Sequence, residues 1–208
     1  MNSLNISTII IIITGITSFM AFSNHGLFDK LIFWPYRIWR NNEWYRLVSC
    51  SFIHADMQHL LFNMLTFFFF GPYIENAFTI VFGGAGIALF AIMYFGAVAT
   101  ADIYNLFKKR DDYNYRSLGA SGGVSAIIFS YILFNPLGKI YLFFIPIGIP
   151  AVLFGGLYLA YFAYSAKQGR DNIGHIAHFT GSILGFFFPV LFQPVLLRDF
   201  VYKISAGI

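Results

Sequence analysis

Six long stretches of this chain contain no Asp, Glu, Lys or Arg and are apolar over most of their length. A helix needs about 20 mostly apolar residues to cross a bilayer, and each stretch is close to that length. Only 11% of the residues are charged, against about 25% in a soluble domain, so a water-facing surface cannot be covered. We therefore predict an all-α polytopic membrane protein with a single domain over residues 1–208. The predicted spans are residues 6–22, 57–74, 79–101, 119–135, 140–165 and 173–197.

Residues 23–56 form a long first connection, in which aromatic side chains are interleaved with cations and which holds all three tryptophans of the chain. Rings beside cations suit the membrane–water interface, so we expect this connection to lie partly in the bilayer. Residues 102–118 carry the charged run KKRDD and are expected to face water. The net charge of +4 comes from a few loop residues without a stacking platform. This pattern favours lipid headgroups over nucleic acid as the partner.

The cations are distributed unevenly between the two predicted sides of the membrane. Ten of the 13 Lys and Arg residues lie in residues 23–56, 102–118 and 166–172, which six spans would place on one side. Positive charge accumulates on the cytoplasmic side of membrane proteins. The charge count therefore predicts that these connections lie in the cytoplasm and that the N-terminus lies outside.

Polar side chains inside a predicted span are costly in lipid, and they are therefore candidates for function. The set comprises His59, Asn63, Ser121, Ser125, His175, His178 and Ser182. No acidic residue lies inside the predicted spans. That absence disfavours a transporter that couples to protons or cations.

Ser121 lies in the cluster GASGG, where a polar loop meets a helix-like apolar run. The first N–H groups of a helix have no partner within the helix, and Gly122 permits an unusual backbone at the turn. A serine there has free donors beside its own oxygen, as an acyl-transfer nucleophile requires. The alternative is helix packing alone, because Gly119 and Gly123 form a GxxxG spacing that lets another helix approach closely.

A serine nucleophile needs a general base, and the last span offers His178 within GHIAHFTGSILG. Gly181 and Gly185 give this span its own GxxxG face, so two such helices can bring a hydroxyl and an imidazole together. His175 lies one turn earlier, and we expect it to be wetter and the weaker candidate. The alternative for His178 is a hydrogen bond that only packs neighbouring helices.

His59 and Asn63 are four residues apart, so they share one face of the second predicted span. Both side chains can donate hydrogen bonds, and a histidine and an amide aimed at one point can stabilise an oxyanion. The alternative is a polar clasp between helices.

A zinc site is a competing interpretation. The residues that would form it are His54, Asp56, His59, His175 and His178. The chain has no HExxH motif, and these histidines fall in two groups far apart in the sequence. We therefore predict neither a metal nor a cofactor.

The acidic residues near the histidines, Asp56 and Asp171, fall in loops, so a Ser–His dyad fits better than a triad.

Four blocks of the sequence, in order, resemble the rhomboid family of intramembrane serine proteases in its minimal six-helix form. The blocks are EWYRLVSCSFIHAD, HADMQHLLFNM, GASGG and AHFTGSILG. They run from the first connection to the last span, so the resemblance covers nearly the whole chain. GxSG alone is a weak motif, but all four blocks in order and on the expected spans form a specific pattern.

The resemblance implies a role for residues in each block. These are Ser121 as nucleophile, His178 as general base and then acid, His59, Asn63 and the Ser121 backbone N–H as oxyanion donors, and Arg46, His54, Gly119 and Gly122 as supporting residues. Arg46, with Trp44 and Tyr45 beside it, is assigned to a loop that anchors the enzyme in one leaflet.

Two positions depart from the family pattern. Some members carry an aromatic residue one turn after the serine, where it stacks on the catalytic histidine, but this chain has Ser125 there. The orientation of the histidine must then come from elsewhere. Tyr45 stands where Trp often precedes the arginine, which is a conservative change for an interfacial ring.

The resemblance implies an enzyme that hydrolyses peptide bonds in or near transmembrane segments of membrane-protein substrates. It also implies a cytoplasmic N-terminus and an active site that opens on the extracytoplasmic side, which is the reverse of the charge count. We follow the family arrangement and expect a bacterial inner membrane. The alternative function is a catalytically inactive rhomboid-like protein that binds transmembrane clients.

Overall fold

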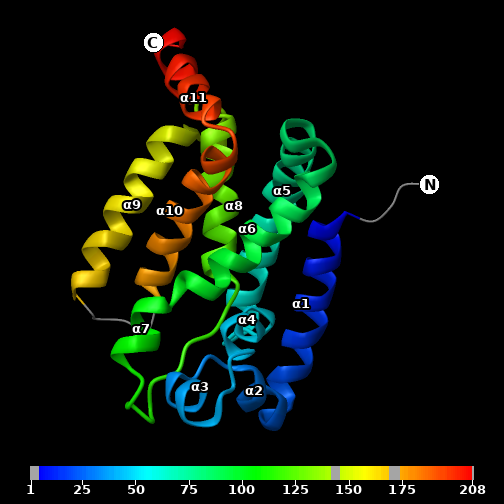
Figure 1. The fold of residues 1–208 in the computed structure, drawn as a ribbon, viewed down its shortest axis with the longest axis vertical. Helices are drawn as coiled ribbons and strands as arrows, with labels where there is room; N and C mark the ends of the chain where they lie inside the picture. Colours follow the sequence, from blue (N-terminus) through cyan, green and yellow to red (C-terminus); the bar gives the residue numbers. More distant parts are fainter. Residues whose placement is uncertain (1–4, 142–145, 169–173, 208) are drawn as a thin grey trace.

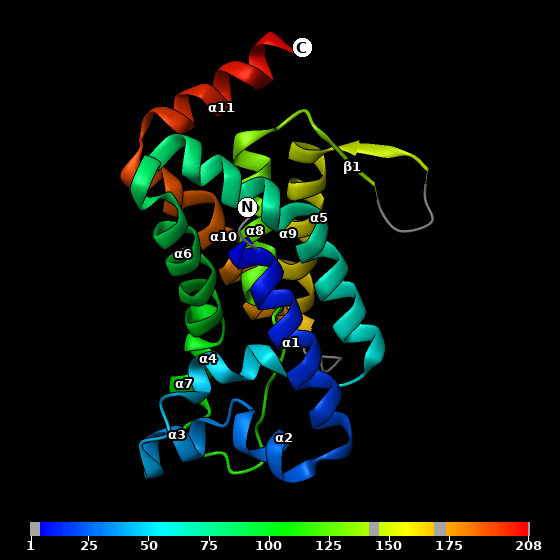
Figure 2. The ribbon, with the colours of Figure 1, turned by 90° about the vertical axis from the view of Figure 1, so that its right-hand side faces the viewer.

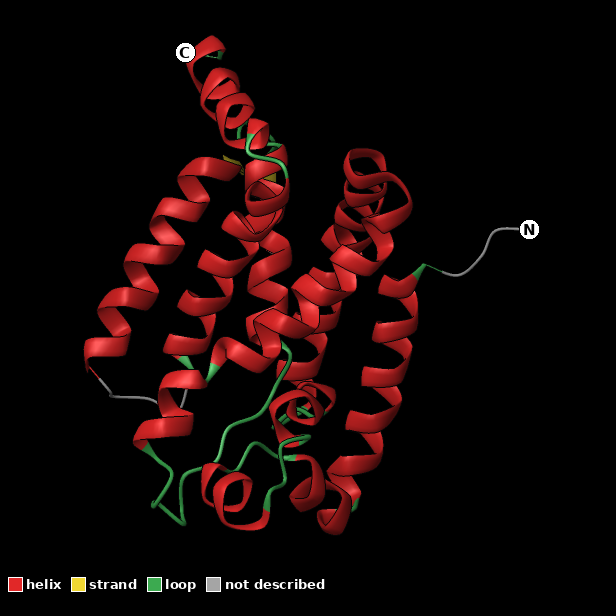
Figure 3. Ribbon diagram, viewed as in Figure 1, coloured by secondary structure: helices red, strands yellow, loops and turns green. Residues whose placement is uncertain are grey.

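The computed structural model describes residues 5–141, 146–168 and 174–207. The described chain is a bundle of helices (Figures 1 and 3) with one short hairpin, which is visible in Figure 2. The long helices are α1 (Ile6–Ser23), α5 (Met57–Phe82), α6 (Gly86–Ala101), α8 (Ser121–Phe134), α9 (Ala151–Gln168), α10 (His175–Phe192) and α11 (Val195–Ala206). The shorter elements are α2 (His25–Leu31), α3 (Pro35–Asn41), α4 (Arg46–Ser49), η1 (Cys50–Phe52), η2 (Gly83–Ala85), α7 (Ile103–Lys108), β1 (Lys139–Tyr141) and β2 (Gly148–Pro150).

Several of the helices are apolar enough to cross a membrane. By length and composition, Ile6–Ser23, the helical run Met57–Lys108 and His175–Phe192 can each do so. The helices Ser121–Phe134 and Ala151–Ala166 are apolar but shorter. These helices indicate an integral membrane protein, and the total of six spans stays a prediction.

Helix α8 is the centre of the bundle and is buried along almost its whole length. It packs against α5, α6, α9 and α10, which surround it in both views (Figures 1 and 2). A helix with no polar face fits this position, because every side of it meets another helix. The residue that begins α8, Ser121, is thereby held inside the bundle.

Helices α8 and α10 approach each other closely through glycine. A Cβ on Gly181 would collide with the backbone of Gly122, and one on Gly185 with the backbone of Ala126. The prediction that Gly119 and Gly123 form one bare face of α8 is wrong. Gly119 precedes the helix, and Gly123 packs against the Tyr94 ring of α6.

One acidic side chain is buried within a helix, contrary to expectation. Helix α5 continues through Pro72 to Phe82 and so includes Glu75. The Glu75 carboxylate accepts hydrogen bonds from the backbone N–H of Ile6 (2.9 Å) and from the N–H (2.9 Å) and hydroxyl (2.6 Å) of Ser7. These donors lie at the N-terminus of α1, whose free N–H groups favour a negative charge. The carboxylate therefore caps a neighbouring helix.

Other predicted boundaries also need correction. The fifth predicted span, residues 140–165, begins with the antiparallel pair β1–β2 and becomes helical only at Ala151. Proline explains the late start, since Pro150 cannot donate a helical hydrogen bond; residues 142–145 lie outside the described chain. The third span begins later than residue 79, because Gly83 ends α5 with φ of +56°. The last span ends at Phe192, and Pro194 separates it from α11.

The first connection folds around a buried arginine. Arg46 is 1% exposed and donates to the carbonyl oxygens of Asp29 (2.7 Å) and Ile32 (2.8 Å). It also pairs with Glu43. Burial raises the pKa of Glu43, but the hydrogen bond and charge of Arg46 outweigh it and hold the pKa below its ordinary value. Arg46 thus ties this connection together from within, while the rings of Trp44 and Tyr45 remain exposed.

Candidate active site

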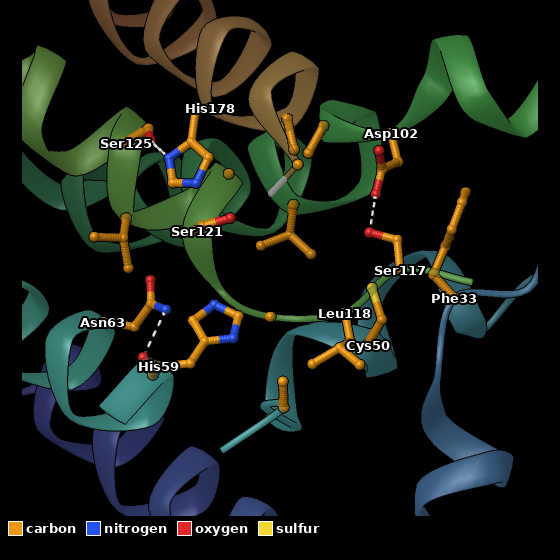
Figure 4. A pocket seen from close by; sticks show the side chains of 18 of the residues that line it. Phe33, Cys50, His59, Asn63, Asp102, Ser117, Leu118, Ser121, Ser125 and His178 are labelled. Atoms are coloured by element: carbon orange, nitrogen blue, oxygen red, sulfur yellow. Dashed lines mark hydrogen bonds between the residues drawn. The ribbon is translucent and has the colours of Figure 1, made fainter. Parts of the chain in front are cut away.

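All four predicted catalytic and oxyanion-stabilising residues line a single cavity of about 1000 Å³. Ser121 and His178 lie on one side of it, and His59 and Asn63 lie across from them (Figure 4). The cavity continues toward Asp102 and Ser117 (Figure 4). The bundle therefore gathers polar groups that are up to 119 residues apart, from His59 to His178, around one space.

Ser121 is the first residue of α8 and follows a loop whose backbone is closely packed at Gly119. Gly119 has φ of +111°, and a Cβ there would lie 2.7 Å from the His59 ring. Its N–H donates to the carbonyl oxygen of Cys50 (2.9 Å). An L side chain at Gly119 is thus excluded by both conformation and space. Lack of space also excludes a side chain at Gly122, where a Cβ would lie 2.5 Å from the Cβ of Ala101.

His54 holds the residue just before Ser121. Its Nδ1 lies 2.9 Å from the hydroxyl of Ser18, which donates its own proton to the Phe52 carbonyl. Nδ1 is therefore the protonated nitrogen, and Nε2 accepts the backbone N–H of Ala120 at 3.3 Å. Burial, and then the neighbouring His59, lower the pKa of His54 to about 3, so the ring is neutral when it accepts this bond.

Acidification is expected to loosen this contact. The folded-state pKa of His54 lies below its ordinary 6.5, so the unfolded chain binds a proton that the folded chain does not. Stability is therefore full above pH 6.5 and is lost as the pH falls toward 3, by about 2 kcal/mol at pH 5. His54→Gln keeps an acceptor without titrating, so its thermal stability in detergent should fall less between pH 7 and pH 5 than that of the wild type. Equal losses in both proteins would contradict this role.

His178 is held by side chains from two other helices. Its Nδ1 lies 2.8 Å from the hydroxyl of Tyr158 on α9 and 3.3 Å from that of Ser125 on α8. The ring of Phe162 stacks on the imidazole, with centroids 4.3 Å apart and planes 9° apart. The other ring nitrogen lies on the side of the ring that faces Ser121 (Figure 4). The structure gives no hydrogen bond between Ser121 and His178 among its described residues, and such bonds often tighten only when substrate binds.

His59 and Asn63 lie on one face of α5, as their spacing predicts. The Asn63 amide donates one hydrogen bond to the His59 carbonyl oxygen at 3.0 Å, and its second N–H is left for the cavity. The His59 ring meets the His54 ring edge to face, with centroids 4.8 Å apart. Helix α5 thus places both side chains at the cavity (Figure 4).

The expectation that His175 is more exposed to water than His178 is wrong. His175 is buried, at 4% exposure, whereas His178 is half-buried. The reason is that the Tyr161 and Phe162 rings of α9 contact His175. Within the described residues, no three His, Cys, Asp or Glu side chains are grouped closely enough to hold a metal ion.

Two α9 residues that contact His178 were not among the predicted site residues. Tyr158 and Phe162 lie in the aromatic run LYLAYFAY, one helical turn apart. The Tyr158 hydroxyl was the one feature that could have indicated this contact, since a buried tyrosine hydroxyl usually has a hydrogen-bond partner. Periodicity alone could not show that this face of α9 meets α10.

The fold and the cavity define a class, that of helical membrane proteins with a polar site enclosed by the bundle. The rhomboid domain family matches residues 41–194, which is most of the chain, and the chain belongs to the rhomboid family.

Curated relatives include plant and bacterial proteins. The mitochondrial RHOMBOID-like protein 12 of Arabidopsis thaliana is 30% identical over 152 residues, which are 69% of this chain and 45% of that protein. RHOMBOID-like protein 4 of the same plant is 32% identical over 154 residues, or 72% of this chain and 35% of that protein. The rhomboid protease GlpG of Haemophilus influenzae is 27% identical over 151 residues, or 70% of this chain and 68% of that protein. The chain thus spans less than half of the two plant relatives.

Proposed function

We propose that this chain is an intramembrane serine endopeptidase that uses a dyad of Ser121 and His178. The observation that carries the proposal is their placement: a serine at a helix N-terminus and an imidazole nitrogen face each other in one cavity (Figure 4). Glycine packing between α8 and α10 brings their two helices together. Family membership supports the same reading, because the family includes a protein named as a protease.

In the proposed mechanism, His178 Nε2 accepts the proton of Ser121 Oγ while Oγ attacks the carbonyl carbon of the scissile bond. The resulting oxyanion is stabilised by the Ser121 backbone N–H, the second amide N–H of Asn63 and the His59 ring. The protonated His178 then gives its proton to the leaving amine. Water, activated by the same imidazole, hydrolyses the acyl-enzyme and restores Ser121.

The proposed substrate is a transmembrane segment of another membrane protein. A cavity of about 1000 Å³ inside an apolar bundle leaves room for both a peptide and water. The carbonyl groups of an intact helix are bonded internally, so the segment has to unwind locally before attack. Gly or Pro near the cleavage position would make that unwinding easier.

We further propose a single domain of six spans, with the cavity opening on the extracytoplasmic side of a bacterial inner membrane. The charge count opposes this orientation, but six of the ten cations in the relevant connections pair with acidic side chains in the described part of the chain. These pairs are Arg37–Glu43, Arg40–Asp111, Arg46–Glu43, Lys109–Asp112, Arg110–Asp111 and Arg116–Asp29. Paired or buried cations bias orientation less than free ones, which weakens the count as an argument against the family arrangement.

A catalytically inactive protein that binds transmembrane clients is the second candidate. The observation in its favour is that no hydrogen bond joins the Ser121 hydroxyl to His178 in the described structure. A serine without a base is inert, whereas a cavity of this size can still hold a client segment.

Cleavage in liposomes separates the two candidates. Wild type and Ser121→Ala would be reconstituted with a panel of tagged transmembrane segments, some carrying Gly or Pro near the bilayer surface. A protease gives shortened products with wild type only. Co-purification of intact segments with both proteins, without any product, would contradict protease activity and favour client binding.

A further inference from the structure

Helix α9 contributes an aromatic pair to the candidate base. The Tyr158 hydroxyl lies 2.8 Å from His178 Nδ1, closer than the Ser125 hydroxyl at 3.3 Å. Phe162, one turn further along α9, lies flat on the same imidazole. One helix therefore fixes both the edge and the face of the His178 ring.

The hydrogen bonds around Nδ1 form a short chain. Tyr158 and Ser125 lie 2.7 Å apart, so each hydroxyl can serve the other as well as the imidazole. A general base needs its Nε2 lone pair turned to the nucleophile, which requires the proton to reside on Nδ1. Nδ1–H can then donate to the Tyr158 oxygen, while the Tyr158 O–H donates to Ser125. This arrangement satisfies all three groups and leaves Nε2 free toward Ser121.

We infer that Tyr158 is a positioning residue for His178 and takes the place that a carboxylate has in a catalytic triad. The inference rests on the proposed function of Ser121 and His178. The Tyr158 oxygen accepts a hydrogen bond from His178 Nδ1–H and keeps this bond when the imidazole becomes charged during attack. Phe162 keeps the ring plane fixed, which supplies the stacking that Ser125 cannot provide from α8.

Removing the phenol hydroxyl tests the inference. Tyr158→Phe keeps the ring and its packing, so it is expected to fold and to lower kcat about tenfold with little change in KM. Ser125→Ala should have a smaller effect, because Tyr158 remains the nearer partner. The double variant removes both acceptors and should lower kcat about 100-fold, more than the product of the single effects. Phe162→Leu provides a second test by removing the flat contact, and it should lower kcat several-fold.

A matched control is available on the same helix. Tyr164 is exposed, at 64%, so Tyr164→Phe deletes a phenol hydroxyl away from the cavity and should keep the wild-type kcat. Labelling of Ser121 by a fluorophosphonate should slow in the same order as kcat across the series, while thermal stability in detergent stays unchanged.

The outcomes distinguish the inference from the function it rests on. An active wild type whose double variant and Phe162→Leu both keep the full kcat would overturn the role of α9 and leave the dyad intact. A folded wild type that neither labels nor cleaves would overturn both. A fall in kcat at constant KM, confined to the α9 and Ser125 variants, supports the inference.

Discussion

Replacing His178 with alanine is expected to lower kcat at least about 10⁴-fold, to the level of Ser121→Ala. The physical reason is that a serine hydroxyl is almost entirely protonated at neutral pH and attacks a carbonyl only when a base takes its proton. The double variant should be no slower than either single variant, since the two residues act as one unit. The measurement is the initial rate of cleavage of one transmembrane reporter in liposomes.

Two further histidine variants make this prediction specific. His25 is exposed at the start of α2, so His25→Ala should keep wild-type activity. His175→Ala tests the other histidine of α10, whose ring lies beneath the α9 aromatics rather than against the cavity lining. Loss of activity in folded His175→Ala, with activity retained in His178→Ala, would show that the base has been misassigned.

Asn63→Ala is expected to lower kcat by about 10²–10³-fold while KM changes little. The Asn63 amide donates one N–H to the His59 carbonyl oxygen, and this bond fixes the orientation of the amide. Its second N–H is available to an oxyanion. A donor fixed in advance stabilises charge that develops only in the transition state, so its loss should appear in kcat.

The control for this variant lies on the same helix. Gln58 is an exposed amide near the start of α5, and Gln58→Ala should leave kcat unchanged. Fluorophosphonate labelling of Asn63→Ala should slow as well, because the phosphonyl oxygen occupies the oxyanion position. A normal kcat with a raised KM would mean that Asn63 binds substrate and does not stabilise the oxyanion.

The sequence predicted which polar residues meet around one cavity better than it predicted the contacts between them. Ser121, His178, His59 and Asn63 were identified because polar groups in apolar spans are rare and costly. The glycines of α10 correctly indicated a close helix contact, since a small residue leaves one face open. The same reasoning failed at Gly119, because a GxxxG spacing does not show where a helix begins.

The remaining differences come from contacts between segments far apart in the sequence. The predicted second span stops just before Glu75, yet this side chain is buried in α5 and caps α1, 68 residues away. Tyr158 was one tyrosine among several in an aromatic helix, and only the packing of α9 against α8 and α10 gives it its partners, Ser125 and His178. Most of the β1–β2 hairpin fell inside a predicted span because residues 140–150 carry no charge.

The most direct test of the central claim is the mass of the intact protein after reaction with a fluorophosphonate probe in detergent. The account predicts a single adduct on the wild type, mapped to Ser121, and no adduct on Ser121→Ala or His178→Ala. A folded wild type without an adduct, or Ser121→Ala labelled like the wild type, would contradict the claim that Ser121 is an activated nucleophile.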